Sequence, residues 1–394
     1  MQLKLFLVLL TVINVHAQNL EEILDFLDKS EKARFIKERT YSTIAQNELS
    51  TSQEAPSIST SLSQAIERTH KGREYSISIG QTIQDPFSLA HKDMATKYLT
   101  SSMNQELKHE LHILELDITS RYHSACISKE IRNKADLLFK QQSNKFNQLK
   151  ESYVLGETSK KNFLFNKLDL LKLRQKVISQ KRAYLEELSY LQETIDNLEI
   201  DDLSCNDLVK ISRHIKLNEI NEHGKIINIS YLQASALAFS KVYDSALSSI
   251  SYKLLFQKEL DTKRYTFGLS IPISSLTSKK ENQRALYLHK NTALIAQKEL
   301  LKSEIFNISK SLQLKVETLY DEYTLLKEDI LPLNFELKAI SKSALNEGEG
   351  TIMQYLDSTR SYSENILEML RIKKEYYFNL FELYKQADLD LGEK

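Results

Sequence analysis

Two runs of apolar residues with a strict seven-residue spacing constrain this chain more than any other feature of its sequence. The first run is Phe163, Leu170, Val177, Tyr184 and Leu191, and the second, 192 residues later, is Tyr355, Tyr362, Met369, Tyr376 and Leu383. This spacing is typical of helices that pack along a coiled-coil seam. A glycine, Gly156 or Gly348, precedes each run at the same distance. The sequence therefore predicts a helix, a glycine turn and a return helix, present in two copies.

The composition favours long helices and argues against several classes of function. Among 394 residues there are only 8 Gly and 4 Pro, so few residues interrupt a helix. The 53 basic and 53 acidic residues give a formal net charge of +0 and are mixed along the chain. Without a basic patch, nucleic acid is not expected as a partner.

No motif in the sequence points to an enzyme, and neither a cofactor nor a metal site is expected. The 9 histidines are scattered, and glycine-rich phosphate-binding loops and nucleophile motifs are missing. His109 and His112 lie three residues apart beside Glu106 and Glu110, which is compatible with metal binding. A solvated helix surface explains these four residues better.

The first 17 residues have the pattern of a secretory signal peptide. Lys4 precedes an apolar stretch from Leu5 to Val15, and small residues end at Ala17. Cleavage after Ala17 would leave Gln18 as the first residue, without a cysteine for lipid attachment. The stretch is too short for a transmembrane helix, and the rest of the chain has no run of 18 apolar residues.

Cys126 and Cys205 are not expected to form a disulfide. Cys126 precedes Gly156 by 30 residues, and Cys205 follows it by 49. If both arms are helical, the distances of the two cysteines from the Gly156 turn, measured along the helix axes, differ by roughly 28 Å. A disulfide requires Cα atoms within about 7 Å. The prediction is that both are buried small residues, although the second arm has a potential break near Asp201 and Asp202.

Period-two alternation indicates two β-hairpins, one at about residues 57–84 and one at about residues 248–274. A helix from Leu20 to about Leu49 precedes the first. Long helices follow each hairpin, at about residues 87–153 and 276–345, and return helices at about 160–195 and 351–388 fold back antiparallel to them. Pro332 is expected to kink the second long helix. We expect two structural repeats, residues 18–200 and 201–394.

The hairpins have one apolar face and one polar face. The positions expected to face lipid are Tyr75, Ile77, Ile79, Tyr252, Leu254, Phe256, Tyr265, Phe267 and Leu269. Such strands suit a membrane barrel with lipid outside and water inside. Four strands cannot close a barrel, so several identical chains would have to contribute strands. The alternative is a soluble, half-buried pair of hairpins.

Four short motifs, in this order along the chain, resemble signatures of the bacterial outer membrane efflux protein family, the TolC-like channels. They are I-G-Q-T-I from Ile79, Y-V-L-G-E-T-S from Tyr153, L-S-I-P-I from Leu269 and E-G-E-G-T-I-M-Q-Y-L-D from Glu347. The resemblance covers the whole chain after the signal peptide. It implies a mainly α protein that forms a homotrimer, with a twelve-stranded β-barrel in the outer membrane and an α-barrel of coiled coils in the periplasm.

The resemblance also implies partners and site residues. Such a channel is the exit duct of a tripartite efflux or type I secretion system, beside a periplasmic adaptor (membrane fusion) protein and an inner membrane transporter of the RND, ABC or MFS class. The expected adaptor-docking turns contain Tyr153, Gly156, Ser159, Gly348 and Thr351. The expected periplasmic gate contains Asp357, Gln354, Glu347 and Glu349. Gln354 and Gly350 depart from the family, which often has an aspartate and a basic residue there.

Two further functions stay open from the sequence. A periplasmic adaptor shares the signal peptide and helical hairpins, but it needs compact β domains for which this chain lacks room. A structural coiled-coil envelope protein would explain the heptads without explaining two matched hairpins.

Overall fold

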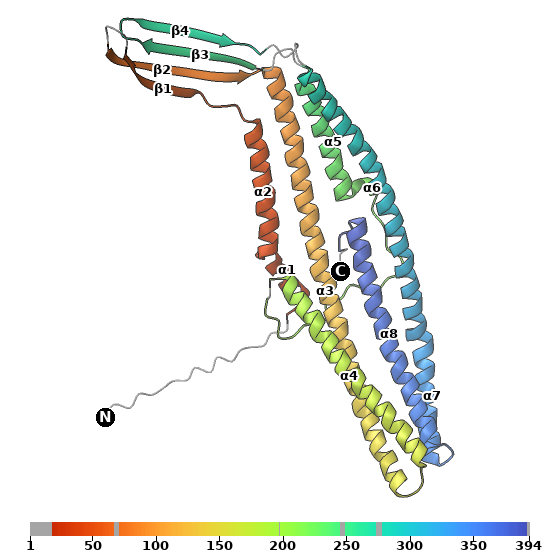
Figure 1. The fold of residues 1–394 in the computed structure, drawn as a ribbon. Coiled ribbons are helices and arrows are strands. Elements are labelled where there is room, and N and C mark those ends of the chain that lie inside the picture. The colour runs from red at the N-terminus through yellow and green to blue at the C-terminus, as the bar shows by residue number, and fades with distance from the viewer. Residues whose placement is uncertain (1–17, 67–70, 197, 245–248, 273–277, 392–394) are drawn as a thin grey trace, which may run out of the picture. The chain divides into compact units, whose positions relative to one another are not determined.

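The computed structural model describes residues 18–66, 71–196, 198–244, 249–272 and 278–391. The proposed signal peptide and residues 67–70 of the first hairpin turn lie outside these ranges. The elements are α1 (Leu20–Leu27), α2 (Glu31–Thr51), β1 (Ser57–Ile66), β2 (Lys71–Gln84), α3 (Pro86–Val154), α4 (Lys160–Thr194), η1 (Ile220–Glu222), α5 (Gly224–Val242), β3 (Ser249–Lys258), β4 (Lys263–Ser270), α6 (Lys279–Thr324), the π-helical η3 (Leu325–Ile330), α7 (Leu331–Glu347) and α8 (Ile352–Ala387) (Figure 1).

The chain divides into two compact units. The turn unit comprises Met1–Phe35, Leu111–Asn218 and Phe306–Lys394, and the sheet unit comprises Ile36–Glu110 and Glu219–Ile305.

In the sheet unit, the four strands form one antiparallel sheet in the order β1-β2-β3-β4. The register pairs Ile77 with Phe256 and Leu254 with Phe267, so the apolar side chains of neighbouring strands share one face. Small and hydroxyl side chains share the other face, where the hydroxyls of Ser59 and Ser78 lie 2.7 Å apart. Because β1 and β4 have a strand on one side only, the sheet has two open edges in the described chain.

In the turn unit, the heptad positions form the seams between helices, as their spacing predicts. Tyr184 and Leu191 of α4 are buried, as are Tyr355, Tyr376 and Leu383 of α8, and the remaining members of both runs are half-buried. The main apolar core joins Tyr376 and Leu383 of α8 to α3 and α6. Burial of this seam stabilises helices whose surfaces are otherwise charged.

Two helices differ from their expected course. The expected helix from Leu20 to Leu49 ends at Leu27, and α2 begins at Glu31. In the second long helix, the six-residue π-helical segment η3 lies just before Pro332. A proline cannot donate the backbone hydrogen bond of a helix interior, and the shifted hydrogen-bonding pattern accommodates that loss.

The expectation for the cysteines is wrong, because Cys126 and Cys205 form a disulfide with Cα atoms 5.5 Å apart. A helical second arm that continued to Cys205 would have kept the two cysteines apart. Instead α4 ends at Thr194, about 12 Å past the level of Cys126 at 1.5 Å per residue. Asp196 then adopts a left-handed conformation with φ of 57°. Residues 195–218, here called the connector, lead back to α3.

Side chains of α3 and α8 hold the backbone of the connector. His123 lies in the core, where its Nδ1 donates to Thr119 O (2.8 Å) and its Nε2 accepts the Val209 N–H (2.8 Å). The Tyr376 hydroxyl donates to Ser212 O (2.7 Å) and accepts from Ser212 N (2.9 Å). Burial raises the pKa of Tyr376 to about 12, so this donor stays protonated at neutral pH. The connector is thus fastened to two helices by polar contacts in addition to the disulfide.

We expect removal of the disulfide to destabilise the turn unit. The bond closes a loop with a sequence separation of 79. By the chain-entropy relation such a loop contributes about 4.5 kcal/mol. The Cys126→Ser/Cys205→Ser double variant should therefore unfold at a lower temperature than the oxidised protein in helical circular dichroism. Reductant should lower the unfolding temperature of the unsubstituted chain and leave that of the double variant unchanged. Equal unfolding temperatures for the two proteins would contradict this prediction.

We also expect a pH dependence from His123. Burial lowers the pKa of His123 to about 4, whereas an unfolded histidine has a pKa near 6.5. Its stabilising contribution is complete above pH 6.5 and is lost as the pH falls towards 4, because only the unfolded chain takes up the proton. The full difference amounts to about 3 kcal/mol. Denaturant unfolding at pH 7 and at pH 5 measures how much of this free energy of unfolding is lost between the two pH values. In His123→Gln, this pH-dependent loss should disappear.

Candidate functional site

The two helix turns of the turn unit require glycine for conformational reasons. Gly156 and Gly348 have φ values of 81° and 78°, in the left-handed region. A Cβ atom on either residue would meet nothing within 4 Å, so the requirement lies in the backbone rather than in packing. Amides after Gly348 close the end of α7, since Glu349 N and Gly350 N donate to Ala344 O at 3.0 and 2.9 Å.

Polar side chains begin the return helices after both turns. Ser159 caps α4 by accepting the Asn162 N–H at 3.3 Å. Thr351 caps α8, where its hydroxyl accepts the Gln354 N–H (3.3 Å) and the Gln354 side chain accepts the Thr351 N–H (2.9 Å). Gln354, expected at the gate, therefore serves as the second member of a capping box. Ser159 and Thr351 have the same role in the two turns.

Side chains near the turns fix the helices to one another. The ring of Tyr153 stacks on Phe163 at 4.6 Å and 12°, which ties the end of α3 to α4. The buried Asn166 of α4 donates to Met353 Sδ of α8 at 3.1 Å. Beside Gly156, Val154 and Leu155 are 77% and 73% exposed. This exposed apolar pair was missed from the sequence, although two adjacent apolar residues next to a turn glycine are a visible signal.

Of the expected gate residues, Asp357 has the most extensive contacts. Its Oδ1 lies 3.0 Å from Nη2 of Arg360, and Nη1 of Arg360 lies 2.8 Å from Oδ2 of Asp169 on α4. Arg360 thus joins two carboxylates from two helices. Glu347 and Glu349 are exposed, and Glu347 accepts the Ser343 hydroxyl at 2.7 Å.

Sequence reasoning missed Arg360 and Asp169. The three-residue spacing of Asp357 and Arg360 is a recognisable helix ion pair. Asp169, in contrast, is 191 residues from Arg360 in sequence, so only the packing of α4 against α8 reveals it.

The nine strand positions expected to face lipid lie on one face of the sheet. Their exposed fractions include 77% for Tyr265, 66% for Phe267 and 39% for Tyr75, so no described segment covers this face. Ile58, Leu62 and Ile66 of β1 share it. A polar pair also lies there, since the Tyr252 hydroxyl donates to Gln81 Oε1 at 3.0 Å.

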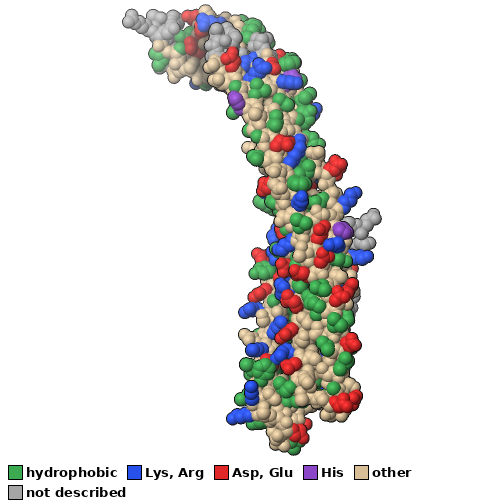
Figure 2. All heavy atoms as spheres, turned by 90° about the vertical axis from the view of Figure 1, so that its right-hand side faces the viewer, with side chains coloured by type: hydrophobic (Ala, Val, Ile, Leu, Met, Phe, Trp, Pro, Cys, Tyr) green, Lys and Arg blue, Asp and Glu red, His purple; other side chains and the backbone are tan. Residues whose placement is uncertain are grey.

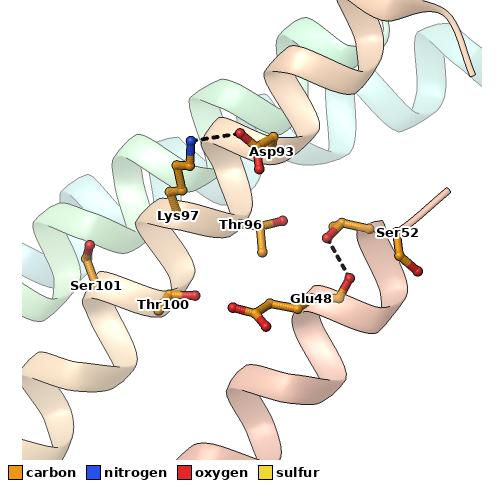
Figure 3. Close-up of a pocket in the computed structure, with 8 residues that line it drawn as sticks. Glu48, Ser52, Asp93, Thr96, Lys97, Thr100 and Ser101 are labelled. Atoms are coloured by element: carbon orange, nitrogen blue, oxygen red, sulfur yellow. Dashed lines mark hydrogen bonds and ion pairs between the residues drawn. The ribbon is translucent and has the colours of Figure 1, made fainter.

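His109, His112, His223 and one polar cavity of the sheet unit do not have the arrangement of a catalytic centre. His112 Nε2 lies 3.1 Å from Leu389 O, and the His109 ring lies 5.6 Å from that of His223. A polar cavity of about 520 Å³ lies between α2 and α3 (Figure 3). Its lining has hydroxyl groups, the Asp93–Lys97 ion pair (2.9 Å) and Glu48, without a histidine or cysteine. Such a lining lacks an activated nucleophile.

Comparisons with known proteins identify the fold but not a sequence family. No family model and no curated protein sequence matches this chain. Among solved structures, CusC, studied for transmembrane channel formation, is similar with a TM-score of 0.79 and 12% identity, over 93% of this chain and 91% of that one. The chain shares the fold of outer membrane channels.

Two further channels support this conclusion. The outer membrane channel OprN matches with a TM-score of 0.78 and 12% identity, over 94% of this chain and 90% of that one. The MtrE outer membrane channel of Neisseria gonorrhoeae, in its open state, matches with a TM-score of 0.77 and 15% identity, over 94% and 89%. The mainly α fold class with a small four-stranded sheet is thereby confirmed.

Among the described ranges, no helix has the apolar length that a bilayer-crossing helix requires.

We expect alanine at the turn glycines to destabilise the helix turns. A left-handed conformation costs a residue with a Cβ atom about 1–2 kcal/mol, so Gly156→Ala and Gly348→Ala should each increase hydrogen exchange at their turns. Asparagine tolerates this conformation better, and Gly156→Asn should have a smaller effect. If exchange in all three variants equals that of the unsubstituted chain, the glycines are dispensable.

Proposed function

We propose that this chain is the outer membrane exit duct of an export system that spans the cell envelope. Its sheet joins those of two further copies in a twelve-stranded barrel, and its helices form a tunnel in the periplasm. Substrate passes through unchanged, so the chain is not an enzyme.

The four-stranded sheet carries this proposal. No segment that the structure describes covers its apolar face or pairs with the outer side of either edge strand, and its opposite face is rich in serine, glycine and threonine. In a bilayer every backbone polar group must be paired, so the edges have to meet other strands. Strands of 8 to 14 residues have the length of membrane-crossing strands. The fold likeness favours this channel over an adaptor or a fibrous coiled coil.

The helix turns are the proposed contact with a periplasmic adaptor, which couples the duct to an inner membrane transporter of the RND, ABC or MFS class. Tyr153, Gly156, Ser159, Gly348 and Thr351 shape the two turns. The exposed Val154 and Leu155 provide apolar surface for the adaptor. On the face drawn in Figure 2, basic and acidic side chains are interspersed along the helices, which suits a solvated outer wall.

Extraction and conductance test the proposed function. The chain should require detergent for extraction from the outer membrane, have the mass of a trimer by light scattering, and conduct ions in a planar bilayer. An adaptor or a coiled-coil stalk should not conduct. A monomer that folds in water without lipid or detergent contradicts the proposal.

Substitutions at the proposed gate should change ion selectivity in opposite directions. Arg360→Gln removes the cation between Asp169 and Asp357, so the permeability of K⁺ relative to Cl⁻ should rise by about twofold or more. Asp357→Asn removes a carboxylate and should lower the same ratio. Reversal potentials in a KCl gradient measure both. A change of the same sign in the two variants would exclude an electrostatic role for this pair.

A further inference from the structure

Lys253 is a charged residue in the middle of the sheet, on the face that carries the small side chains. Its neighbours in the register are Gly80 on β2 and Gly268 on β4. Ser251 and Leu255 precede and follow it on the same face. At about 3.3 Å per residue, Lys253 lies about 13 Å along β3 from its first residue, Ser249. This position is at mid-depth in a membrane-crossing strand.

The two glycines leave space around the Lys253 side chain. A Cβ atom at position 80 would lie 3.1 Å from Tyr252 O and 3.8 Å from Lys253 Cβ, so a larger residue would crowd β3. Lys253 is exposed, and within the described residues no carboxylate pairs with it. Its ammonium group is therefore available to a ligand.

Other charges on this face lie nearer the hairpin turns. Arg264 is level with Gln257, four residues beyond Lys253, and Arg264 Nη1 lies 3.3 Å from Glu259 Oε1. Glu74 is opposite Ser63, further towards the turn. At the level of Lys253, the described strands therefore carry a single unbalanced positive charge per chain.

We propose that Lys253 lines the water-filled lumen of the barrel and, repeated once per copy, forms a ring of ammonium groups that binds polyvalent anions. This inference rests on the proposed function. A lysine at mid-depth facing hydrocarbon would strongly destabilise a membrane barrel, so the small-residue face has to be the wet one. Three like charges around one lumen attract anions, and the low-dielectric wall strengthens the attraction. The anionic ligand is recognised by charge, through phosphate, sulfate or carboxylate groups.

Thiol labelling tests the orientation of Lys253. The only two cysteines of the sequence are joined in a disulfide, so one introduced thiol is the sole reactive thiol. In lipid vesicles, Lys253→Cys should react with the membrane-impermeant reagent sulfonatoethyl methanethiosulfonate. The thiolate attacks the reagent's sulfur–sulfur bond, which forms a mixed disulfide and releases methanesulfinate. The matched variant Leu254→Cys, on the lipid-facing side, should not react. The reverse pattern overturns the proposal.

Block by tripolyphosphate tests anion binding. In a planar bilayer at low salt, where charges are weakly screened, tripolyphosphate added on the side of the hairpin turns should reduce the wild-type current. Lys253→Gln should weaken this block by about tenfold. Lys258→Gln removes the same charge from the same strand, on the opposite face, and should leave the block unchanged.

The possible failures are distinguishable. If the wild-type channel conducts and Lys253→Gln is blocked like the wild type, the anion-binding ring is wrong and the duct is unaffected. If the wild-type chain does not conduct, the proposed function fails and this inference fails with it.

Discussion

In the part of the chain that the structure describes, no strand pairs with the outer edges of β1 and β4, and this sets the requirements for the whole assembly. Each edge presents backbone N–H and C=O groups along its length, and no described segment covers the apolar face beside them. In water, the unpaired backbone groups of the edges can be hydrated, but the exposed apolar face is unfavourable. In lipid, the apolar face is favourable, but the unpaired backbone groups are not. A closed barrel shared among copies satisfies both requirements. The proposed trimer follows from this conflict more directly than from any helix contact.

In the turn unit, the contacts between helices hold long helices with charged surfaces in a fixed alignment. The buried heptad seam supplies apolar contact along α4 and α8, and the connector fastens α3 to α8 through His123, Tyr376 and the disulfide. Near the turns, polar links add to the apolar contacts, with Arg360 between Asp169 and Asp357. The Asp357 carboxylate is largely exposed, and an ion pair at such a site contributes little stability, whereas Asp169 is only 17% exposed.

The electrostatic pattern gives the proposed duct two different regions. Carboxylates lie near the helix turns, and Lys253 lies on the small-residue face of the sheet. An assembly of identical chains repeats each charge around the lumen, so one residue per chain is enough to set the field in each region.

The features that depend on local periodicity could be predicted from the sequence. The heptad runs, the alternating strands and the turn glycines Gly156 and Gly348 predicted helices, hairpins and reversals, because spacing fixes which side chains share a face. The contacts between segments that are far apart in the sequence became visible only in the folded structure. The bond between Cys126 and Cys205 was not expected, because spacing alone does not show where α4 ends or that the connector returns to α3. For the same reason, the partner of Arg360 on α4 and the two glycines that flank Lys253 became visible only when helices packed and strands paired.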